Sequence, residues 1–335
     1  MTNDVLRLAA ELMAIDSTSG QEGELMAHLS LMLESRGWRV KRIPVTPGRM
    51  NVYATCVHEP LVTLSTHLDT VPPYIPPRLE RDTLWGRGAC DAKGTAAAMI
   101  LAAEQLRERN CPVALLFVVG EEVSHDGAHA ANEQTGTSRV LIDGEPTGLK
   151  LGLGTKGAMR AVIRTTGVAA HSAYPELGDS AITKLVTLLQ ELPHLELPHD
   201  DLLGATTINV GQIAGGVADN VIAPSAEARI MVRLVSDADE VWRLLETWVA
   251  GRATLERGSL VPAMRLSSVP GFETTIVAFA TDVPELTHWG TPYLYGPGSI
   301  HVAHTSQEHI TRAELLEAVS GYVRLAEAAL ASDRR

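Results

Sequence analysis

The sequence predicts an α/β protein built from two domains. Its 335 residues exceed the usual size of one domain. Apolar strands alternate with helices in the first and last parts of the chain, and a central block follows the order β-α-β-β-α-β of a ferredoxin-like sandwich. We therefore expect a main α/β domain of residues 1–157 and 268–335, interrupted by an inserted α+β domain of residues 158–267.

Hydrophobic spacing places the elements of the main domain. Val5, Leu8 and Leu12 recur at helical spacing, and Gly37 marks the end of a second helix. Short apolar or β-branched runs predict strands between the helices. We expect helices at 4–14, 22–36, 95–109 and 311–330, and strands at 38–45, 51–57, 61–67, 113–119 and 139–143.

The inserted block is predicted by the same criteria. Strands are expected at 158–166, 205–213, 226–235 and 260–266. Helices at 179–191 and 237–249 complete the pattern, and the chain then returns to the main domain.

The composition limits the kinds of partner that the protein can be expected to bind and the cellular compartment in which it is expected. The formal net charge is −12, with no basic patch interleaved with aromatic residues, so nucleic acid is not an expected partner. The apolar run 113–120 is too short to cross a bilayer, and we expect no membrane association. Three cysteines without a paired spacing fit a reducing cytoplasm, and the first residues do not resemble a secretory signal.

A histidine and an aspartate follow the strand predicted at 61–67. Strand alternation sends His67 and Asp69 to the same side. An imidazole beside a carboxylate is typical of a metal ligand and the group that orients it. A buried hydrogen bond between the two side chains is an equal alternative at this point.

Carboxylates follow the next predicted strands. Glu121 and Glu122 come directly after the strand at 113–119, and Glu145 follows the strand at 139–143. Asp91 lies in a glycine-rich loop just before a helix, where an N-cap is the simpler interpretation. An exposed turn would likewise accommodate Glu121 and Glu122. Because ligands of open α/β sheets bind outside the carboxyl ends of strands, these residues together predict a divalent cation site, in which one aspartate can bridge two ions.

Five short motifs, taken in order, resemble those of the M20 family of dinuclear-zinc peptidases and deacylases. The resemblance covers nearly the whole chain. Its motifs are Ser65-x-His67-x-Asp69-x-Val71-Pro72, Gly86-Arg87-Gly88-x-x-Asp91-x-Lys93-Gly94, Glu121-Glu122, Gly144-Glu145-Pro146-Thr147, and Ala303-His304 before Glu308. It implies a zinc-peptidase-like α/β/α catalytic domain with an inserted lid or dimerisation domain.

The resemblance also implies roles for single residues. The implied metal ligands are His67, Asp91, Glu122, Glu145 and His304. Asp91 would bridge two zinc ions, Asp69 would orient His67, and Glu121 would be the general base. A cis peptide is expected after Asp91. His301, in the same loop, is a rival to His304, and the last motif carries Gln307-Glu308 where the family usually has Asp-Glu.

Other residues near the motifs carry two interpretations. His125 and Asp126 follow the third motif and compete with it as metal ligands. Lys93 either anchors its loop or is solvated. Cys90 is expected to pack rather than to bind metal, because thiolate zinc sites contain several cysteines.

The inserted domain and the last loop carry implied substrate contacts. His171 resembles a histidine that reaches the partner's active site in dimeric members, so a homodimer through the inserted domain is expected. Arg233 resembles an arginine that binds the substrate carboxylate. Asn220 and Gly298 lie in segments that resemble substrate-binding loops.

The expected activity is hydrolysis of the amide bond of an N-acetylated amino acid, with release of acetate. Within the family the last loop is most similar to that of acetylornithine deacetylases and their acetylcitrulline and acetyl-lysine relatives, which implies arginine or lysine biosynthesis. The alternatives are a succinyl-diaminopimelate desuccinylase, a dipeptidase or carboxypeptidase, and a metal-binding homologue without activity. Glu121 argues against the last, because a binding protein needs no base. Zinc is the expected metal, with cobalt or manganese as substitutes.

Overall fold

The computed structural model describes residues 4–134 and 136–332. The chain divides into two compact units. Unit 1 comprises Met1–Leu153, Leu266–Thr275 and Thr281–Arg335, and unit 2 comprises Gly154–Arg265 and Ile276–Ala280. The sequence predicts the inserted domain at 158–267, and unit 2 comprises Gly154–Arg265 together with the short segment Ile276–Ala280.

Unit 1 is built on a mixed sheet in which the strand order is β1-β2-β6-β3-β7-β17-β8. Its central strands β6, β3, β7 and β17 are parallel, so their carboxyl ends meet at one edge of the sheet. Strands β3 and β6 are buried along their whole length, and β6 is accordingly a continuous apolar run, whereas β3 also contains the buried polar residues Ser65 and His67. The bounds are β1 Arg39–Thr46, β2 Arg49–Thr55, β3 Val62–His67, β6 Val113–Val118, β7 Val140–Asp143, β8 Leu151–Thr155 and β17 Thr291–Leu294.

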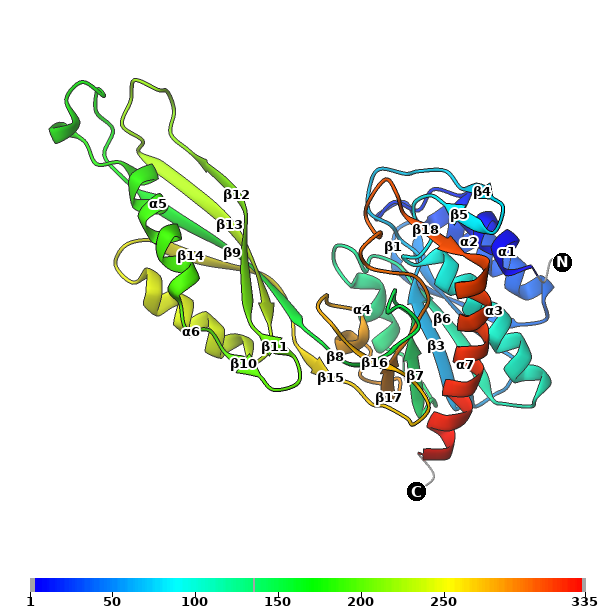
Figure 1. The fold of residues 1–335 in the computed structure, drawn as a ribbon. Coiled ribbons are helices and arrows are strands. Elements are labelled where there is room, and N and C mark those ends of the chain that lie inside the picture. The colour runs from blue at the N-terminus through cyan, green and yellow to red at the C-terminus, as the bar shows by residue number, and fades with distance from the viewer. Residues whose placement is uncertain (1–3, 135, 333–335) are drawn as a thin grey trace. The chain divides into compact units, whose positions relative to one another are not determined.

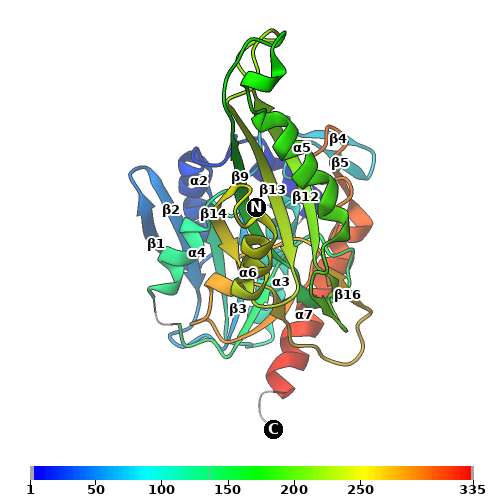
Figure 2. The same cartoon turned by 90° about the vertical axis from the view of Figure 1, so that its left-hand side faces the viewer.

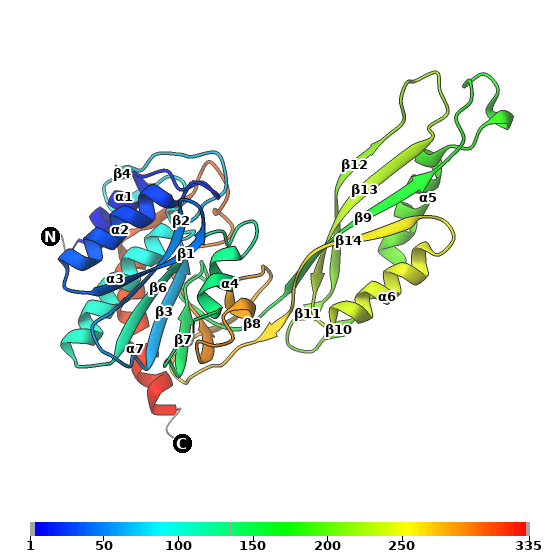
Figure 3. The same cartoon turned by 180° about the vertical axis from the view of Figure 1, so that it is seen from behind.

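Helices cover both faces of this sheet (Figure 1, Figure 3). One face and its core are covered by α1 Val5–Met13, α2 Gly23–Ser35, α3 Lys93–Glu108 and α7 Arg312–Ser332. The other face carries α4 Asp126–Asn132 and the short 3-10 turn η3 Val283–Glu285, with a smaller core around Leu116, Leu141 and Trp289. A separate three-stranded sheet joins β4 Arg78–Glu80, β5 Thr83–Trp85 and β18 His309–Thr311.

Unit 2 is an antiparallel sheet with two helices on one face (Figure 2). The strand order is β12-β13-β9-β14, and the chain order β9-α5-β12-β13-α6-β14 is the β-α-β-β-α-β order predicted from the sequence. Its core residues lie between the helices and the sheet. The bounds are β9 Gly157–Thr166, α5 Ala181–Glu191, β12 Thr207–Gly215, β13 Ser225–Leu234, α6 Ala238–Val249 and β14 Thr254–Val261.

Short elements complete the two units. Unit 2 also contains η1 Pro175–Leu177, η2 Leu192–His194, and the two-residue strands β10 His199–Asp200 and β11 Gly204–Ala205. Strand β15 Met264–Arg265 pairs with the end of β8, and β16 Thr274–Val277 also pairs with β8. None of the helices within the described ranges is both long and apolar enough to cross a membrane.

The fold class is confirmed, and one predicted element is wrong. The last strand of the inserted domain was expected at 260–266, but β14 spans Thr254–Val261. Its first six residues are mostly polar because β14 lies at the edge of the sheet, where most of its side chains are exposed. The sequence also did not predict α4 or the three-stranded sheet, whose elements are too short for a hydrophobic period.

Candidate active site

The site lies at the carboxyl edge of the parallel strands of unit 1. His67 is the last residue of β3, and the chain leaves β6 through Gly120 into Glu121 and Glu122. Glu145 follows β7 after Gly144. Register pairs His67 with Val118 of β6 and Ser65 with Asp143 of β7, so the three segments leave the sheet side by side.

Asp91 and His304 reach this edge from loops. Asp91 ends the glycine-rich loop before α3, and its peptide bond to Ala92 is cis, as the resemblance implies. His304 follows β17 through a longer loop and adopts a positive φ of 63°. Arg87 and Glu308, which are not among the predicted site residues, bind the backbone of the two loops.

Asp91 lies between the two histidines. Its Oδ1 is 3.0 Å from His67 Nε2, and its Oδ2 is 3.2 Å from His304 Nε2. Glu122 Oε1 lies 2.9 Å from His304 Nε2, whereas Glu145 Oε1 lies 4.0 Å from His67 Nε2. The arrangement therefore has two ends, each with one imidazole and one glutamate, joined by a single carboxylate.

The carboxylates and imidazoles of the site shift one another's pKa values. Burial raises the pKa of Glu145 well above its ordinary value, opposed by the charge of His67 and reinforced by neighbouring carboxylates. Hydrogen bonds to Asp91 and Glu122 raise the pKa of His304 to about 10. Burial would raise the pKa of Asp91, but its hydrogen bonds to both histidines hold it below the ordinary value. Buried carboxylates this close repel one another unless positive charge lies between them.

The donor set fits divalent metal ions. Ligand atoms of His67, Asp91 and Glu122 all lie within 4.8 Å of one another. Neutral imidazole nitrogens combined with carboxylate oxygens are the ligands that zinc, manganese and cobalt accept. The two oxygens of Asp91 face different histidines, so one carboxylate can serve both ends.

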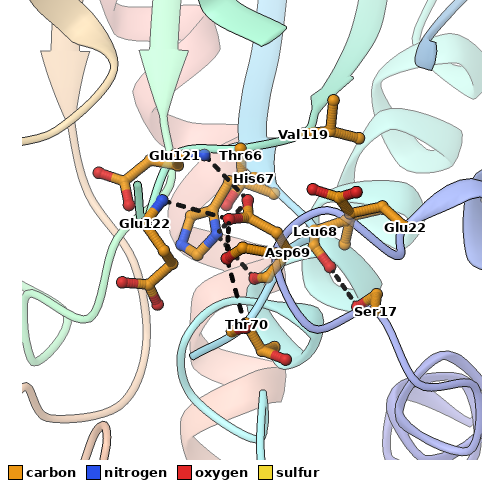
Figure 4. Close-up of polar contacts among 12 residues, drawn as sticks. Ser17, Glu22, Thr66, His67, Leu68, Asp69, Thr70, Val119, Glu121 and Glu122 are labelled. Atoms are coloured by element: carbon orange, nitrogen blue, oxygen red, sulfur yellow. Dashed lines mark hydrogen bonds and ion pairs between the residues drawn. The ribbon is translucent and has the colours of Figure 1, made fainter. Parts of the chain in front are cut away.

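Asp69 contacts two segments of the site (Figure 4). His67 Nδ1 lies 3.0 Å from the backbone carbonyl of Asp69 and 3.5 Å from its Oδ1. The carboxylate itself accepts the backbone N–H groups of Glu121 and Glu122 at 3.0 and 3.2 Å, and the hydroxyl of Ser19 at 2.8 Å. Asp69 is completely buried, and it thus positions the carboxylate loop as well as the imidazole.

Glu121 also lies at this edge and is not among the predicted ligands. Burial raises its pKa well above the ordinary value, His67 opposes this shift, and the charges of Asp282 and Glu122 add to it. A carboxyl group with a raised pKa is suited to accepting and returning a proton near neutral pH.

The role of Glu308 was missed at the level of the sequence. Its buried carboxylate pairs with Arg87 at 2.7 Å and accepts the backbone N–H groups of Gly88, Cys90 and Asp91. Arg87 also donates to the carbonyl of Thr305, the residue after His304. Arg87 and Glu308 both lie in the recognised motifs, but their 221-residue separation hides the pairing.

The competing residues make other contacts. The backbone N–H of His301 donates to Ser299 Oγ at 3.3 Å, and His125 Nδ1 lies 2.7 Å from buried Asp282. Asp126 pairs with Arg49, which also holds the buried carboxylate of Glu22. Lys93 is buried and donates to the carbonyl of Ile15, so it anchors the loop.

The predicted substrate contacts fall in both units. Gly298 lies in unit 1 with a φ of 80°, and a Cβ there would approach that of buried Cys90 to 2.4 Å, so only glycine fits. In unit 2, His171 is exposed, and the carbonyl of Asn220 accepts the N–H of Ser172 at 3.0 Å. Arg233, near the end of β13, is half-buried.

The fold and the site together define a metal-dependent hydrolase, and comparisons with known proteins give its family. A sequence model described as Peptidase family M28 matches residues 51–147, and one described as Peptidase dimerisation domain matches residues 153–254. A probable carboxypeptidase of Neosartorya fischeri is 38% identical over 97% of this chain and 86% of its own length. A peptidase M20 domain-containing protein of Schizosaccharomyces pombe is 37% identical over 96% of this chain and 84% of its own.

Solved structures share the same fold. A tripeptidase from Staphylococcus aureus superposes with a TM-score of 0.81 at 20% identity, covering 99% of this chain and 98% of that one. The YXEP protein of Bacillus subtilis, described as a dinuclear metal binding peptidase, superposes with a TM-score of 0.73 at 17% identity, covering 98% of each chain.

The chain belongs to the M20 peptidase family. It is accordingly a metal-dependent hydrolase of amide bonds. The names of these relatives favour the carboxypeptidase or dipeptidase alternative over the acetylornithine-type deacetylase expected from the sequence. The deacetylase expectation rested on one loop, Gly296–Ser299, whereas the carboxypeptidase relatives match nearly the whole chain.

Proposed function

We propose that this protein is a metal-dependent carboxypeptidase acting on short peptides. The observation that carries the proposal is the position of Asp91 between His67 and His304, with Glu121 on the adjoining loop. A binding site alone would need the ligands but not Glu121, whose backbone Asp69 holds on the loop that also carries Glu122. The full-length likeness to probable carboxypeptidases supports the choice of substrate class.

The proposed ligands for two divalent ions are His67 and Glu145 at one end, and Glu122 and His304 at the other, with Asp91 shared. Ions bound there would lower the pKa of a water molecule and polarise the scissile carbonyl. Zinc is the proposed metal, and cobalt or manganese are substitutes to be tested.

Proton transfer is assigned to Glu121. Its carboxylate takes a proton from the attacking water and returns it to the leaving amine as the amide bond breaks. Asp69 holds the backbone of Glu121 in place, so the base is set relative to the ligands rather than moving with a free loop.

Substrate binding is assigned to the residues that the resemblance implies. Arg233 pairs with the terminal carboxylate of the substrate, while Asn220 and Gly298 contact its backbone. His171 from a second subunit donates to the developing oxyanion, where losing one donor typically costs about 2.7–4 kcal/mol. The match to a dimerisation domain over residues 153–254 supports a homodimer formed through unit 2.

The test is a substrate panel with zinc, cobalt or manganese added. It contains N-blocked dipeptides, free dipeptides, N-acetylornithine, N-acetylcitrulline, N-acetyl-lysine and N-succinyl-diaminopimelate. Preference for peptides supports the proposal, whereas preference for an N-acyl amino acid restores the deacetylase or desuccinylase alternatives. Glu121→Gln should lower kcat by about 10²–10⁴-fold without loss of bound metal. If Glu121→Gln retains turnover with metal bound, the base assignment is wrong.

The dimeric role of His171 has its own experiment. His171→Ala and Glu121→Gln proteins are each expected to be nearly inactive. Mixing them should restore about a quarter to a half of the activity, because a heterodimer contains one site with both residues intact. Loss of His171 without effect on turnover would remove the residue from the mechanism.

A further inference from the structure

One face of the unit 2 sheet is not covered by its helices. Helices α5 and α6 lie together on the opposite face (Figure 1). Alternation along β9 and β13 places Arg160, Arg164, Arg229 and Arg233 on the uncovered face, while their neighbours Ala161, Ile163, Ile230 and Val232 enter the core. Four arginines therefore share this face.

Two of these arginines are paired with carboxylates. Arg164 forms ion pairs with Glu227 and Glu256, and Arg229 contacts Glu227 at 3.3 Å. Arg160 and Arg233 have no carboxylate within ion-pair distance among the residues that the structure describes. Their positive charges are therefore available to an external anion.

The two unpaired arginines are close neighbours. Arg160 lies opposite Met231, and Arg233 lies opposite Ala158, so they are diagonal neighbours on adjacent strands. Such positions are about 7 to 8 Å apart along the sheet, within reach of two long side chains. Partial burial lowers the pKa of Arg233, and the charge of Arg160 lowers it further, as expected for like charges that face each other.

A cavity adjoins Arg160. It has a volume of about 490 Å³, and its lining includes Arg160, Arg229, Asn209, Gln212 and Met231, with Arg233 just outside that lining. Asn209 lies opposite Met231 and Gln212 lies opposite Arg229, so amide side chains are placed beside the arginines. The cavity thus offers amide hydrogen-bond donors next to Arg160, whose charge has no carboxylate partner among the described residues.

We propose that Arg160 and Arg233 together form a dicarboxylate site that selects peptides ending in an acidic residue. This inference rests on the proposed function, in which Arg233 binds the terminal carboxylate. Arg160 then takes the side-chain carboxylate of the same residue. A C-terminal glutamate carries its two carboxylates on one short chain, which matches two guanidinium groups on adjacent strands. A neutral terminal residue leaves Arg160 without a partner.

The experiment compares substrates that differ only in one charge. N-acetyl-Ala-Glu and N-acetyl-Ala-Gln are hydrolysed by the metal-loaded protein and by Arg160→Gln and Arg164→Gln variants. The wild type should prefer the Glu peptide by about tenfold or more in kcat/KM, mainly through KM. The preference should collapse in Arg160→Gln and persist in Arg164→Gln, which removes the same charge from the same strand and face.

Binding is measured separately from turnover. Titration calorimetry with free glutamate and glutamine, at fixed ionic strength, should show tighter glutamate binding that Arg160→Gln abolishes and Arg164→Gln retains. If the peptides are not cleaved but this binding pattern holds, the proposed function fails and the dicarboxylate site stands. Equal handling of Glu and Gln by the wild type would overturn the inference. The inference would also be overturned if the preference for the Glu peptide survived in Arg160→Gln. It would likewise be overturned if the wild type preferred N-acetyl-Glu-Ala over N-acetyl-Ala-Glu.

Discussion

The carboxylate of Asp69 accepts the backbone N–H of Glu121 at 3.0 Å. This bond joins the end of β3 to the loop that follows β6, and the neighbouring N–H of Glu122 binds the same carboxylate at 3.2 Å. The segment carrying the first histidine and the segment carrying the proposed base are therefore held in one geometry by a completely buried group.

Asp69→Asn should weaken metal affinity or activity by about 10–100-fold, the usual effect of losing a group that orients a ligand. The amide keeps one acceptor oxygen but brings an NH₂ group toward the two backbone donors. Metal competition with a chelator and steady-state kinetics measure the effect. Ser19→Ala removes the third contact of the same carboxylate and should cost far less. A similar loss in Asp69→Asn and Ser19→Ala would contradict the role assigned to the backbone contacts.

His304→Ala should remove one metal ion, because His304 Nε2 contacts both Glu122 and Asp91. His301→Ala is the matched control, since His301 lies three positions earlier in the same loop and is exposed. Metal stoichiometry by mass spectrometry distinguishes them. Retention of both ions in His304→Ala, with loss in His301→Ala, would exchange their roles.

Glu308→Gln should destabilise the protein by about 3–5 kcal/mol, because it leaves the buried charge of Arg87 without a charged partner. The same change should loosen the loop that carries Asp91 and so weaken metal binding. Glu327→Gln breaks an ion pair with Arg109 whose side chains are both about half exposed, and it should cost less than about 1 kcal/mol. Denaturant unfolding of the two variants, at equal metal concentration, provides the comparison. An equal loss of unfolding free energy in the two variants would show that the buried Glu308 does not stabilise the loop through Arg87.

The Arg49–Asp126 pair should make stability depend on acid pH. Burial opposes ionisation of Asp126, but its hydrogen bond to Arg49 holds the pKa below the ordinary value of 3.8. Because the folded-state pKa is the lower one, the contribution is present above about pH 3.8 and is lost as pH falls through the folded value. Asp126→Asn should be less stable than the wild type at pH 7, by about 1 kcal/mol for a partly exposed pair. The difference should shrink on acidification, and a constant difference from pH 7 to pH 3 would contradict the assignment.

Much of the fold could be predicted because its signals are local. The apolar runs of β3 and β6 and the helical spacing of α1, α5 and α6 mark those elements directly. The edge strand β14 was misplaced because the polar residues Thr254, Glu256 and Ser259 carry no apolar signal. Helix α4 is a single seven-residue piece, too short for periodicity to distinguish it from a loop.

The sequence by itself determined the residue types and the order of the site. It placed His67, Glu121 and Glu145 after successive strands, which is sufficient to predict a cation site when the strands are parallel. The tertiary structure decided which groups meet. It set Asp91 between His67 and His304, gave Asp69 two backbone donors, and paired Arg87 with Glu308 across 221 positions.

The physical reason is that such pairings arise only after distant loops are closed onto one another. Strand alternation and helix period are set by backbone geometry over a few residues. The hydrogen bonds between Glu308 and the loop of Asp91 depend on the tertiary positions of segments remote in sequence. The same holds for the absence of a carboxylate partner for Arg160 among the described residues. Neither follows from spacing along the chain.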